Sequence, residues 1–163
     1  MGTALGMTGY HWALLGAGLA AILPGIGSSI GVTMAAKMTA GVLSEEPEKF
    51  GGVLVLTAMP GSQGIYGFIT AVMVVVLFNL LQPGGADKMT LFTGTRIFFA
   101  TLPVTINCFA SAIYQAITSS ACIKAVAKKG EVAGKAIVLP ALVETYAVLS
   151  LIASIFLLMA VAA

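Results

Sequence analysis

Residues 136–163 read AIVLPALVETYAVLSLIASIFLLMAVAA, an apolar stretch whose only charged side chain is Glu144. At about 1.5 Å per residue, a helix of this length can cross a bilayer core of about 30 Å. A charged side chain at that depth costs about 2.5–3.5 kcal/mol on insertion scales, so it is kept where it binds, relays or pairs with something. Glu144 is therefore the first candidate functional residue.

The composition is that of an integral membrane protein. Hydrophobic residues make up 59% of the chain and charged residues only 9%, whereas soluble domains hold about 25% charged residues. The net charge of +2 comes without a basic cluster interleaved with aromatic residues, so we expect no nucleic-acid partner. The two cysteines and one histidine form no Cys-x-x-Cys or Cys/His cluster, so we expect no cofactor. The first residues lack a charged region, and we expect no removable signal peptide.

Charged residues and turn formers divide the chain into four apolar spans, at residues 10–43, 52–81, 91–126 and 136–163. Each span is long enough to cross a membrane as a helix. We therefore predict an all-α membrane protein whose four transmembrane helices form two helical hairpins, residues 1–81 and 82–163.

The two predicted hairpins show signs of an internal duplication. A shift of 83 residues aligns identical residues in the two halves: Ser28 with Ser111, Ile30 with Ile113, Glu48 with Glu131, Gly51 with Gly134, Leu56 with Leu139 and Ala58 with Ala141. The same shift places Gly61 opposite Glu144. One half thus keeps a carboxylate and the other has none.

The basic residues predict the orientation of the chain in the membrane. The two short hairpin loops are flanked by Lys37, Lys49, Lys124, Lys128, Lys129 and Lys135. The opposite side carries only Lys88 and Arg96. Because cytoplasmic loops are enriched in Lys and Arg, we expect a cell-membrane protein with both loops in the cytoplasm and both termini outside.

Small residues and prolines mark where the helices pack or loosen. The first span carries a stripe at Gly16, Ala20, Gly27, Gly31 and Ala35. Such a stripe lets helix backbones approach closely, and its length suggests contact with neighbouring copies in an oligomer. In the second span, Pro60 has no N–H to donate, so the carbonyl oxygen of Leu56 is left available at membrane depth.

Polar residues form one face on each of two further spans. Met59, Ser62, Gln63 and Tyr66 are spaced i, i+3, i+4 and i+7, and the third span carries Ser111, Gln115 and Thr118 or Ser119 on one face. The glutamines could hold helices together, at about 0.6–2 kcal/mol per contact. Alternatively they could join Glu144 in a set of oxygen ligands, which hard cations prefer.

Three stretches resemble a known family: MPGSQGIYG (59–67), SAIYQAITSS (111–120) and LPALVETYA (139–147). They are similar to the four-helix rotor-ring subunit of V-type and archaeal-type rotary ATPases, called the proteolipid or K subunit. The resemblance covers nearly the whole chain. It implies a homo-oligomeric ring surrounded by lipid, in which Glu144 binds the transported ion.

The sodium-type members of this family imply a particular ion site. The implied Na⁺ ligands are Glu144, Gln115, Gln63, Ser62 and the carbonyl of Met59. The Tyr66 hydroxyl would hydrogen-bond Glu144 and act as the gate that closes the site. Ser62 replaces a threonine and Met59 replaces a leucine of the family pattern. The proline argument points to the carbonyl of Leu56 and the family to that of Met59, and both stay open here.

The resemblance also implies a mechanism with partner subunits. The ion neutralises Glu144 so that the occupied site can face lipid while the ring turns. A stator membrane subunit provides aqueous half-channels and a basic group that favours ion release. Central-stalk subunits dock on the loops at residues 44–50 and 127–135. ATP hydrolysis belongs to partner subunits, so the chain is not an enzyme on its own.

Two other functions compete with a sodium rotor. A proton-carrying rotor protein of the same family needs a carboxyl group but not the additional oxygen ligands, so their number favours sodium. A small dimeric four-helix exporter, coupled to protons through Glu144, predicts a substrate cavity lined by aromatic residues. Only Tyr66 and Tyr146 are near Glu144 in the sequence pattern, which disfavours the exporter.

Overall fold

The computed structural model describes residues 6–84 and 89–163, and all the regular secondary structure in these residues is helical. The first span is the single helix α1 (Gly9–Glu45) and the third is the single helix α5 (Leu91–Lys128). The second and fourth spans are each divided into shorter helices. These are η2 (Pro47–Lys49), α2 (Phe50–Ala58), η3 (Met59–Gly61) and α3 (Ser62–Leu77), then η4 (Gly130–Val132), α6 (Ala133–Ala136) and α7 (Val138–Ala162).

Within residues 6–84 and 89–163, four spans are long and apolar enough to cross a membrane, which confirms the predicted fold class. The second span ends at Leu77 and not at residue 81, because Asn79 adopts a left-handed conformation with a φ of 51°. The N–H of Leu80 then donates to the carbonyl of Val75 at 3.0 Å, and that of Asn79 to the carbonyl of Val76 at 3.3 Å. This pair of bonds is the Schellman motif, which closes a helix at its C-terminus.

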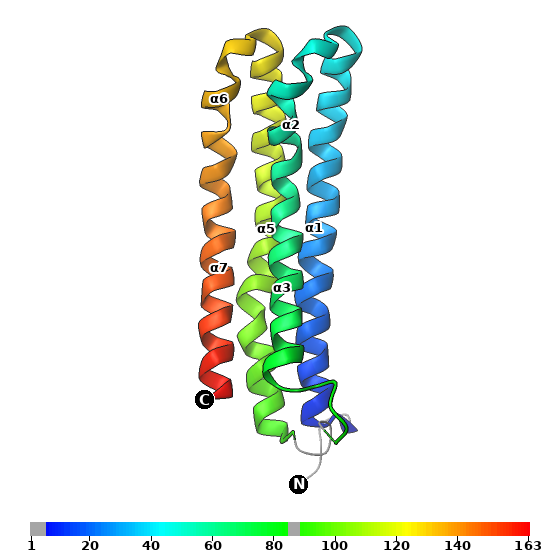
Figure 1. The fold of residues 1–163 in the computed structure, drawn as a ribbon, viewed down its shortest axis with the longest axis vertical. Helices are drawn as coiled ribbons and strands as arrows, with labels where there is room; N and C mark the ends of the chain where they lie inside the picture. The colour runs from blue at the N-terminus through cyan, green and yellow to red at the C-terminus, as the bar shows by residue number, and fades with distance from the viewer. Residues whose placement is uncertain (1–5, 85–88) are drawn as a thin grey trace.

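The four spans form one bundle in which α1 and α5 lie side by side (Figure 1). The helix α3 packs against α1 and α5, and α7 packs against α5 and α3. The short helices η2 and η4 lie at one end of the bundle, here called the loop end. The helix α7 ends at the opposite end, here called the terminal end.

The two hairpins are built alike, in the register that the sequence predicts. The helices α1 and α5 end at Glu45 and Lys128, which are 83 positions apart. The short helices that follow, Pro47–Lys49 and Gly130–Val132, are separated by the same 83 positions. The duplicated hairpin is therefore visible in the backbone, while the limits at residues 81 and 82 stay a prediction.

The glycine stripe brings α1 against α5 of the same chain. A Cβ atom on Gly27 would lie 2.7 Å from the carbonyl oxygen of Phe109, and one on Gly31 would lie 2.8 Å from that of Ala112. Neither distance leaves room for a side chain, so the predicted close approach is present. The predicted contact of this stripe with neighbouring copies is wrong, because the stripe packs within the chain.

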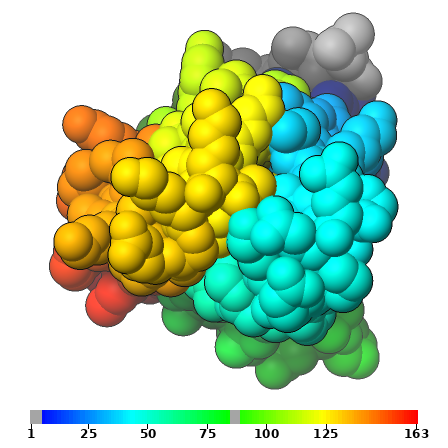
Figure 2. Space-filling view, turned by 90° about the horizontal axis from the view of Figure 1, so that it is seen from above, coloured from blue at the N-terminus to red at the C-terminus, as the bar shows by residue number. Residues whose placement is uncertain are grey.

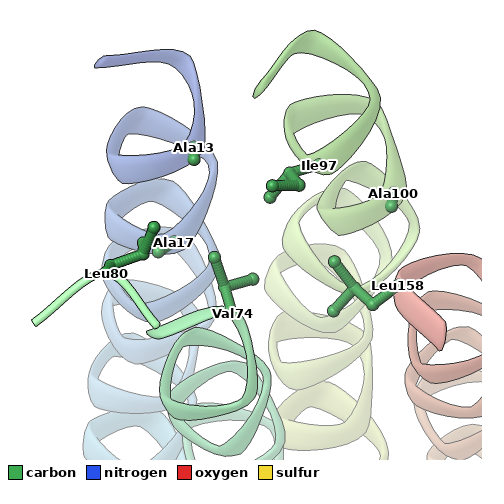
Figure 3. Packing of buried hydrophobic residues seen from close by; sticks show 7 residues of the cluster. All are labelled: Ala13, Ala17, Val74, Leu80, Ile97, Ala100 and Leu158. Atoms are coloured by element: carbon green, nitrogen blue, oxygen red, sulfur yellow. The ribbon is translucent and has the colours of Figure 1, made fainter. Parts of the chain in front are cut away.

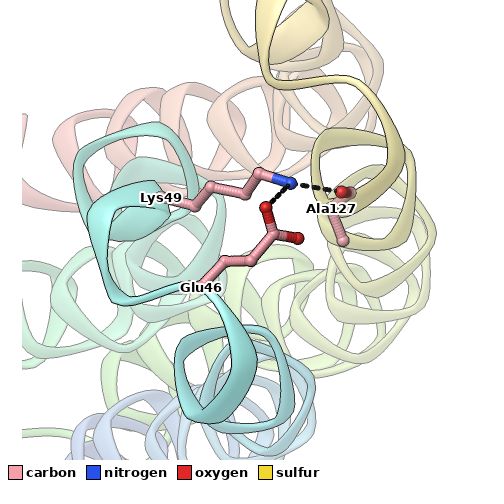
Figure 4. Close-up of polar contacts among 3 residues, drawn as sticks. All are labelled: Glu46, Lys49 and Ala127. Atoms are coloured by element: carbon pink, nitrogen blue, oxygen red, sulfur yellow. Dashed lines mark hydrogen bonds and ion pairs between the residues drawn. The ribbon is translucent and has the colours of Figure 1, made fainter.

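Buried apolar side chains join all four spans at the terminal end. The cluster in Figure 3 contains Ala13, Ala17, Val74, Leu80, Ile97, Ala100 and Leu158. At the loop end the two hairpin loops lie side by side (Figure 2). There the Lys49 ammonium donates to the carbonyl of Ala127 at 2.5 Å and pairs with the Glu46 carboxylate at 2.6 Å (Figure 4). This contact links the first loop to the last turn of α5.

We predict that Gly27→Ala destabilises the bundle, because the added methyl group would overlap the Phe109 carbonyl. Overpacking of this kind costs about 1–3 kcal/mol. The measurement is the temperature at which the purified oligomer dissociates in detergent. Gly25→Ala is the matched control, since a Cβ atom on Gly25 would meet no described atom within 4 Å. Equal dissociation temperatures for the two variants would contradict the prediction.

Candidate functional site

The second span is interrupted at Pro60, next to the predicted site. Residues Met59–Gly61 form a turn of 3₁₀ helix between α2 and α3. Both the N–H and the hydroxyl of Ser62 donate to the carbonyl of Met59, the hydroxyl at 3.0 Å. The carbonyl of Met59 is thus already an acceptor, whereas Pro60 offers no N–H to the carbonyl of Leu56.

The Glu144 carboxylate is half-buried on α7 and receives hydrogen bonds from two other spans. The Tyr66 hydroxyl, on α3, donates to Oε1 at 2.7 Å. The Gln115 amide, on α5, donates to Oε2 at 3.3 Å. Each carboxylate oxygen therefore has a donor from a different helix, and the carboxylate holds three spans together at membrane depth.

The two glutamines form a buried chain of hydrogen bonds that leads to this carboxylate. The Gln63 amide donates to Oε1 of Gln115 at 2.6 Å, and both side chains are fully buried. The Gln115 amide also donates to the carbonyl of Pro140 at 3.1 Å. At the other end of the chain of bonds, the Ser62 hydroxyl lies 3.4 Å from Oε1 of Gln63. Ser62, Gln63, Gln115 and Glu144 thus form one connected network.

A groove of about 520 Å³ runs along the outside of this network. It is lined by Glu144, Met59, Ser62, Leu54, Val55, Ala58, Gly61 and Ile65. These lining residues are apolar apart from the carboxylate and the serine, and none of them is aromatic. The structure therefore brings together every predicted site residue: Met59, Ser62 and Glu144 at the groove, Gln63 and Gln115 beneath it, and Tyr66 on the carboxylate.

The polar face of α5 continues through Ser119 and not through Thr118. Ser119 is fully buried, and its hydroxyl has no hydrogen-bond partner among the described residues. The Thr118 hydroxyl instead donates to the carbonyl of Tyr114, one turn earlier on its own helix. Ser111, the third residue of the predicted face, donates to the carbonyl of Val143 on α7 at 3.3 Å.

Sequence reasoning missed the Pro140 carbonyl as a partner of Gln115. A backbone oxygen carries no signal in a sequence, and the only available hint was the proline four residues before Glu144. The Pro140 carbonyl fixes the position of the Gln115 amide, because the NH₂ group of Gln115 donates to both this carbonyl and the Glu144 carboxylate.

The arrangement offers a carboxylate, two hydroxyls, two amides and a backbone carbonyl within one small region. Carboxylate, hydroxyl and carbonyl oxygens are the ligands of hard cations. An amide has both an oxygen and an NH₂ group, so it can donate to an empty carboxylate or, after rotation, present its oxygen to a cation. Chemically, the site can hold either a proton on Glu144 or a small cation among these oxygens.

Comparison with known proteins gives consistent matches. The family of the ATP synthase C subunit matches residues 15–74 and again residues 98–157. The chain is 38% identical over 151 residues to the V-type sodium ATPase subunit K of Enterococcus hirae, covering 93% of this chain and 92% of the relative. It is also 38% identical over 147 residues to the A-type ATP synthase subunit K of Methanocaldococcus jannaschii, covering 90% of this chain and 61% of the relative.

We predict that Ser119→Ala leaves the stability of the oligomer unchanged or raises it, because the buried hydroxyl has no hydrogen-bond partner in the part of the chain that the structure describes. Ser111→Ala should lower stability by roughly 0.6 kcal/mol, the average for a hydrogen bond between membrane helices. The measurement is again the dissociation temperature of the oligomer in detergent. A loss of stability in Ser119→Ala as large as that in Ser111→Ala would show that Ser119 has a partner.

Proposed function

The chain belongs to the family of the ATP synthase C subunit as a rotor proteolipid of V/A-type rotary ATPases, and we propose that it carries Na⁺ at Glu144. The observation that carries the proposal is that Tyr66 and Gln115 both donate to one carboxylate, with Gln63 bonded to Gln115 behind it. A relative that is 38% identical is named a sodium ATPase subunit, which supports the choice of ion.

In this proposal the Na⁺ ligands are Glu144, Gln115, Gln63, Ser62 and the carbonyl of Met59. The cation takes the place of the amide N–H that now donates to Glu144. The Gln115 side chain turns its oxygen to the ion, since an N–H group cannot coordinate a cation. Tyr66 keeps its hydrogen bond to the carboxylate and acts as the gate of the occupied site.

The Met59 carbonyl is the better candidate than that of Leu56 for the backbone ligand. Met59 and Ser62 line the groove together with Glu144, whereas Leu56 is fully buried. The Ser62 hydroxyl already points to the Met59 carbonyl at 3.0 Å. These two oxygens are therefore close enough to share one ion.

Neutralising Glu144 makes the turning of the ring possible in energetic terms. A bare carboxylate facing lipid costs several kcal/mol, and a bound cation removes most of that cost. The groove beside Glu144 is apolar, as expected for a site that faces lipid when it is occupied. Release then requires a stator membrane subunit with aqueous half-channels and a basic group that stabilises the free carboxylate.

The remaining partners follow from the same proposal. Central-stalk subunits dock at the loop end, on residues 44–50 and 127–135, which face the cytoplasm, and the termini face outward. Partner subunits hydrolyse or make ATP, and this chain supplies only the ion-carrying step. An ion that crosses 100 mV represents about 2.3 kcal/mol, so several sites must act for each ATP.

A proton-carrying rotor is the second candidate, because a protonated Glu144 also removes the charge. In a proton-carrying rotor, however, the two buried glutamines would have no role beyond joining helices. The dimeric exporter is disfavoured by the groove at Glu144, whose described lining residues include no aromatic side chain. In addition, Tyr146 is exposed on α7 and does not contribute to this groove.

The deciding experiment is carbodiimide labelling of Glu144 in the purified oligomer at several pH values, with and without Na⁺. The reagent reacts with a protonated carboxyl group, so Na⁺ bound at Glu144 should protect it at constant pH. Choline chloride at equal ionic strength is the control for salt. Labelling that depends on pH and ignores Na⁺ would favour the proton rotor, and no labelling of Glu144 at all would contradict both rotor proposals.

We predict that Tyr66→Phe raises the Na⁺ concentration needed for half-maximal protection by roughly 10- to 150-fold. The variant loses one hydrogen bond to a charged group, which is worth about 1.5–3 kcal/mol. Water can replace this bond at a carboxylate that is free to turn toward solvent but not in the closed, ion-bound site, so the loss weakens the ion-bound state more than the free one. Tyr114→Phe is the matched control, because Tyr114 is exposed and lies outside the network. Unchanged protection in Tyr66→Phe would remove Tyr66 from the proposed site.

A further inference from the structure

One face of α7 is uncovered in the described part of the chain, although it repeats the face of the second span that covers Glu144. Its members are Leu142, Thr145, Tyr146 and Leu149, all of them exposed. They lie 83 positions after Met59, Ser62, Gln63 and Tyr66. In the first hairpin this face packs on the second hairpin of the same chain. The matching face on α7 therefore lies ready for a further hairpin.

The first hairpin has a surface equivalent to the one that contains Glu144 and Gln115, and the α7 face of another copy could cover it. The counterparts of Glu144 and Gln115, 83 positions earlier, are Gly61 and Val32. A Cβ atom on Gly61 would lie 3.5 Å from Cγ2 of Val32, so the two residues face each other. Glu144 and Gln115 are neighbours in the same way in the second hairpin. The first hairpin thus keeps the frame of the ion site but not its polar groups.

In a ring, the movement that places one hairpin on the next is repeated until the circle closes, and this movement is called the step here. Within the chain, the step carries the Gln63 face onto Glu144 and Gln115. From the end of one chain, a similar step carries the α7 face onto the first hairpin of the next copy. We infer that Tyr146 of one copy packs on Val32 and Gly61 of the next copy, in the position that Gln63 has in the ion site.

The replaced residues make this second position an apolar seam. Gly61 replaces the carboxylate, Val32 replaces one glutamine and the Tyr146 ring replaces the other. Of the oxygen ligands, only a hydroxyl and a carbonyl remain, those of Thr145 and Leu142. Tyr146 is 65% exposed in the single chain. An aromatic side chain of this kind buries about 150–250 Å² when it is fully covered, which makes it a strong anchor for the contact. Its bulk fills the space left by the absent carboxylate.

The side chains of α1 and α5 indicate that these two helices lie farther apart at this seam than they do within one chain. Gly16 and Gly31 contact α5 closely within the chain, and their counterparts 83 positions later are Phe99 and Tyr114. Both of these side chains are exposed on α5. Where α5 meets α1 of the next copy, the close approach through glycine is therefore impossible. The two hairpins of one chain are packed more tightly than neighbouring chains, and large side chains fill the wider gap.

Crosslinking with paired cysteines tests this seam in the assembled ring. Both native cysteines are buried and are first replaced by alanine. The test variant combines Tyr146→Cys with Val32→Cys, and a short bifunctional thiol reagent is applied to membranes before denaturing electrophoresis. We expect a ladder of bands at multiples of the chain mass, because each link joins one copy to the next. Each single substitution should give no ladder.

The matched control is the equivalent pair inside the chain, Gln63→Cys with Gln115→Cys. Its side chains are in direct contact, so the same reagent should link them without a ladder. A second test pair, Leu149→Cys with Gly61→Cys, corresponds to Tyr66 and Glu144 and covers the case that the first pair prevents assembly.

Two results would overturn the inference: both test pairs linking only within one chain, or both failing to link while the control pair reacts. The identity of the linked peptides, read by mass spectrometry, distinguishes a link within a chain from one between chains. The inference depends on ring assembly and not on the ion that Glu144 carries. A failure of Na⁺ to protect Glu144 would therefore leave the crosslinking result unaffected.

Discussion

A carboxylate inside a membrane-spanning bundle needs hydrogen-bond donors from the protein, because the hydrocarbon of the bilayer supplies none. Glu144 obtains them from Tyr66 on α3 and Gln115 on α5, so three spans must be held in one register. The helix α1 contributes to this register, because Gly31 lies close to both Ala112 of α5 and Pro60 of the second span. The packing of the helices and the geometry of the site thus meet the same requirement, which is to bring hydrogen-bond donors to the Glu144 carboxylate.

Glutamine is well suited to this requirement because its amide is neutral and can either donate or accept. In the structure the Gln115 NH₂ group donates to Glu144, and the Gln63 NH₂ group donates to the Gln115 oxygen. A bound cation would need oxygens on the same groups. The two amides are hydrogen-bonded to each other, so rotation of one changes the partner available to the other. A lysine or a second carboxylate could not serve both states without placing another charge in the membrane.

The sequence predicts which polar residues lie together better than it predicts which helices pack closely. Glu144, Gln63 and Gln115 stand out because polar side chains are rare in apolar spans, and Tyr66 follows from helical spacing. A sequence does not tell which neighbour a helix face meets. The glycine stripe suggests contact with other copies, whereas it packs on α5 of its own chain. For the same reason, periodicity left Thr118 and Ser119 as alternatives. The end of α3 depends on one left-handed residue, Asn79, which a hydropathy pattern does not reveal.

The duplicated fold carries one carboxylate where two equivalent positions exist. If Glu144 carries the ion as proposed, this halves the charge that a ring of a given number of helices moves in one turn. Under the proposed function, each ion that crosses 100 mV requires about 2.3 kcal/mol. With half as many sites, one turn moves half as many ions, so the same ATP energy can drive each ion against a larger gradient. In the proposed seam, Gly61 places no unpaired charge at the contact between copies. Gly61, Val32 and the Tyr146 ring offer packing surface there, so the positions that carry no ion would serve the assembly of the ring.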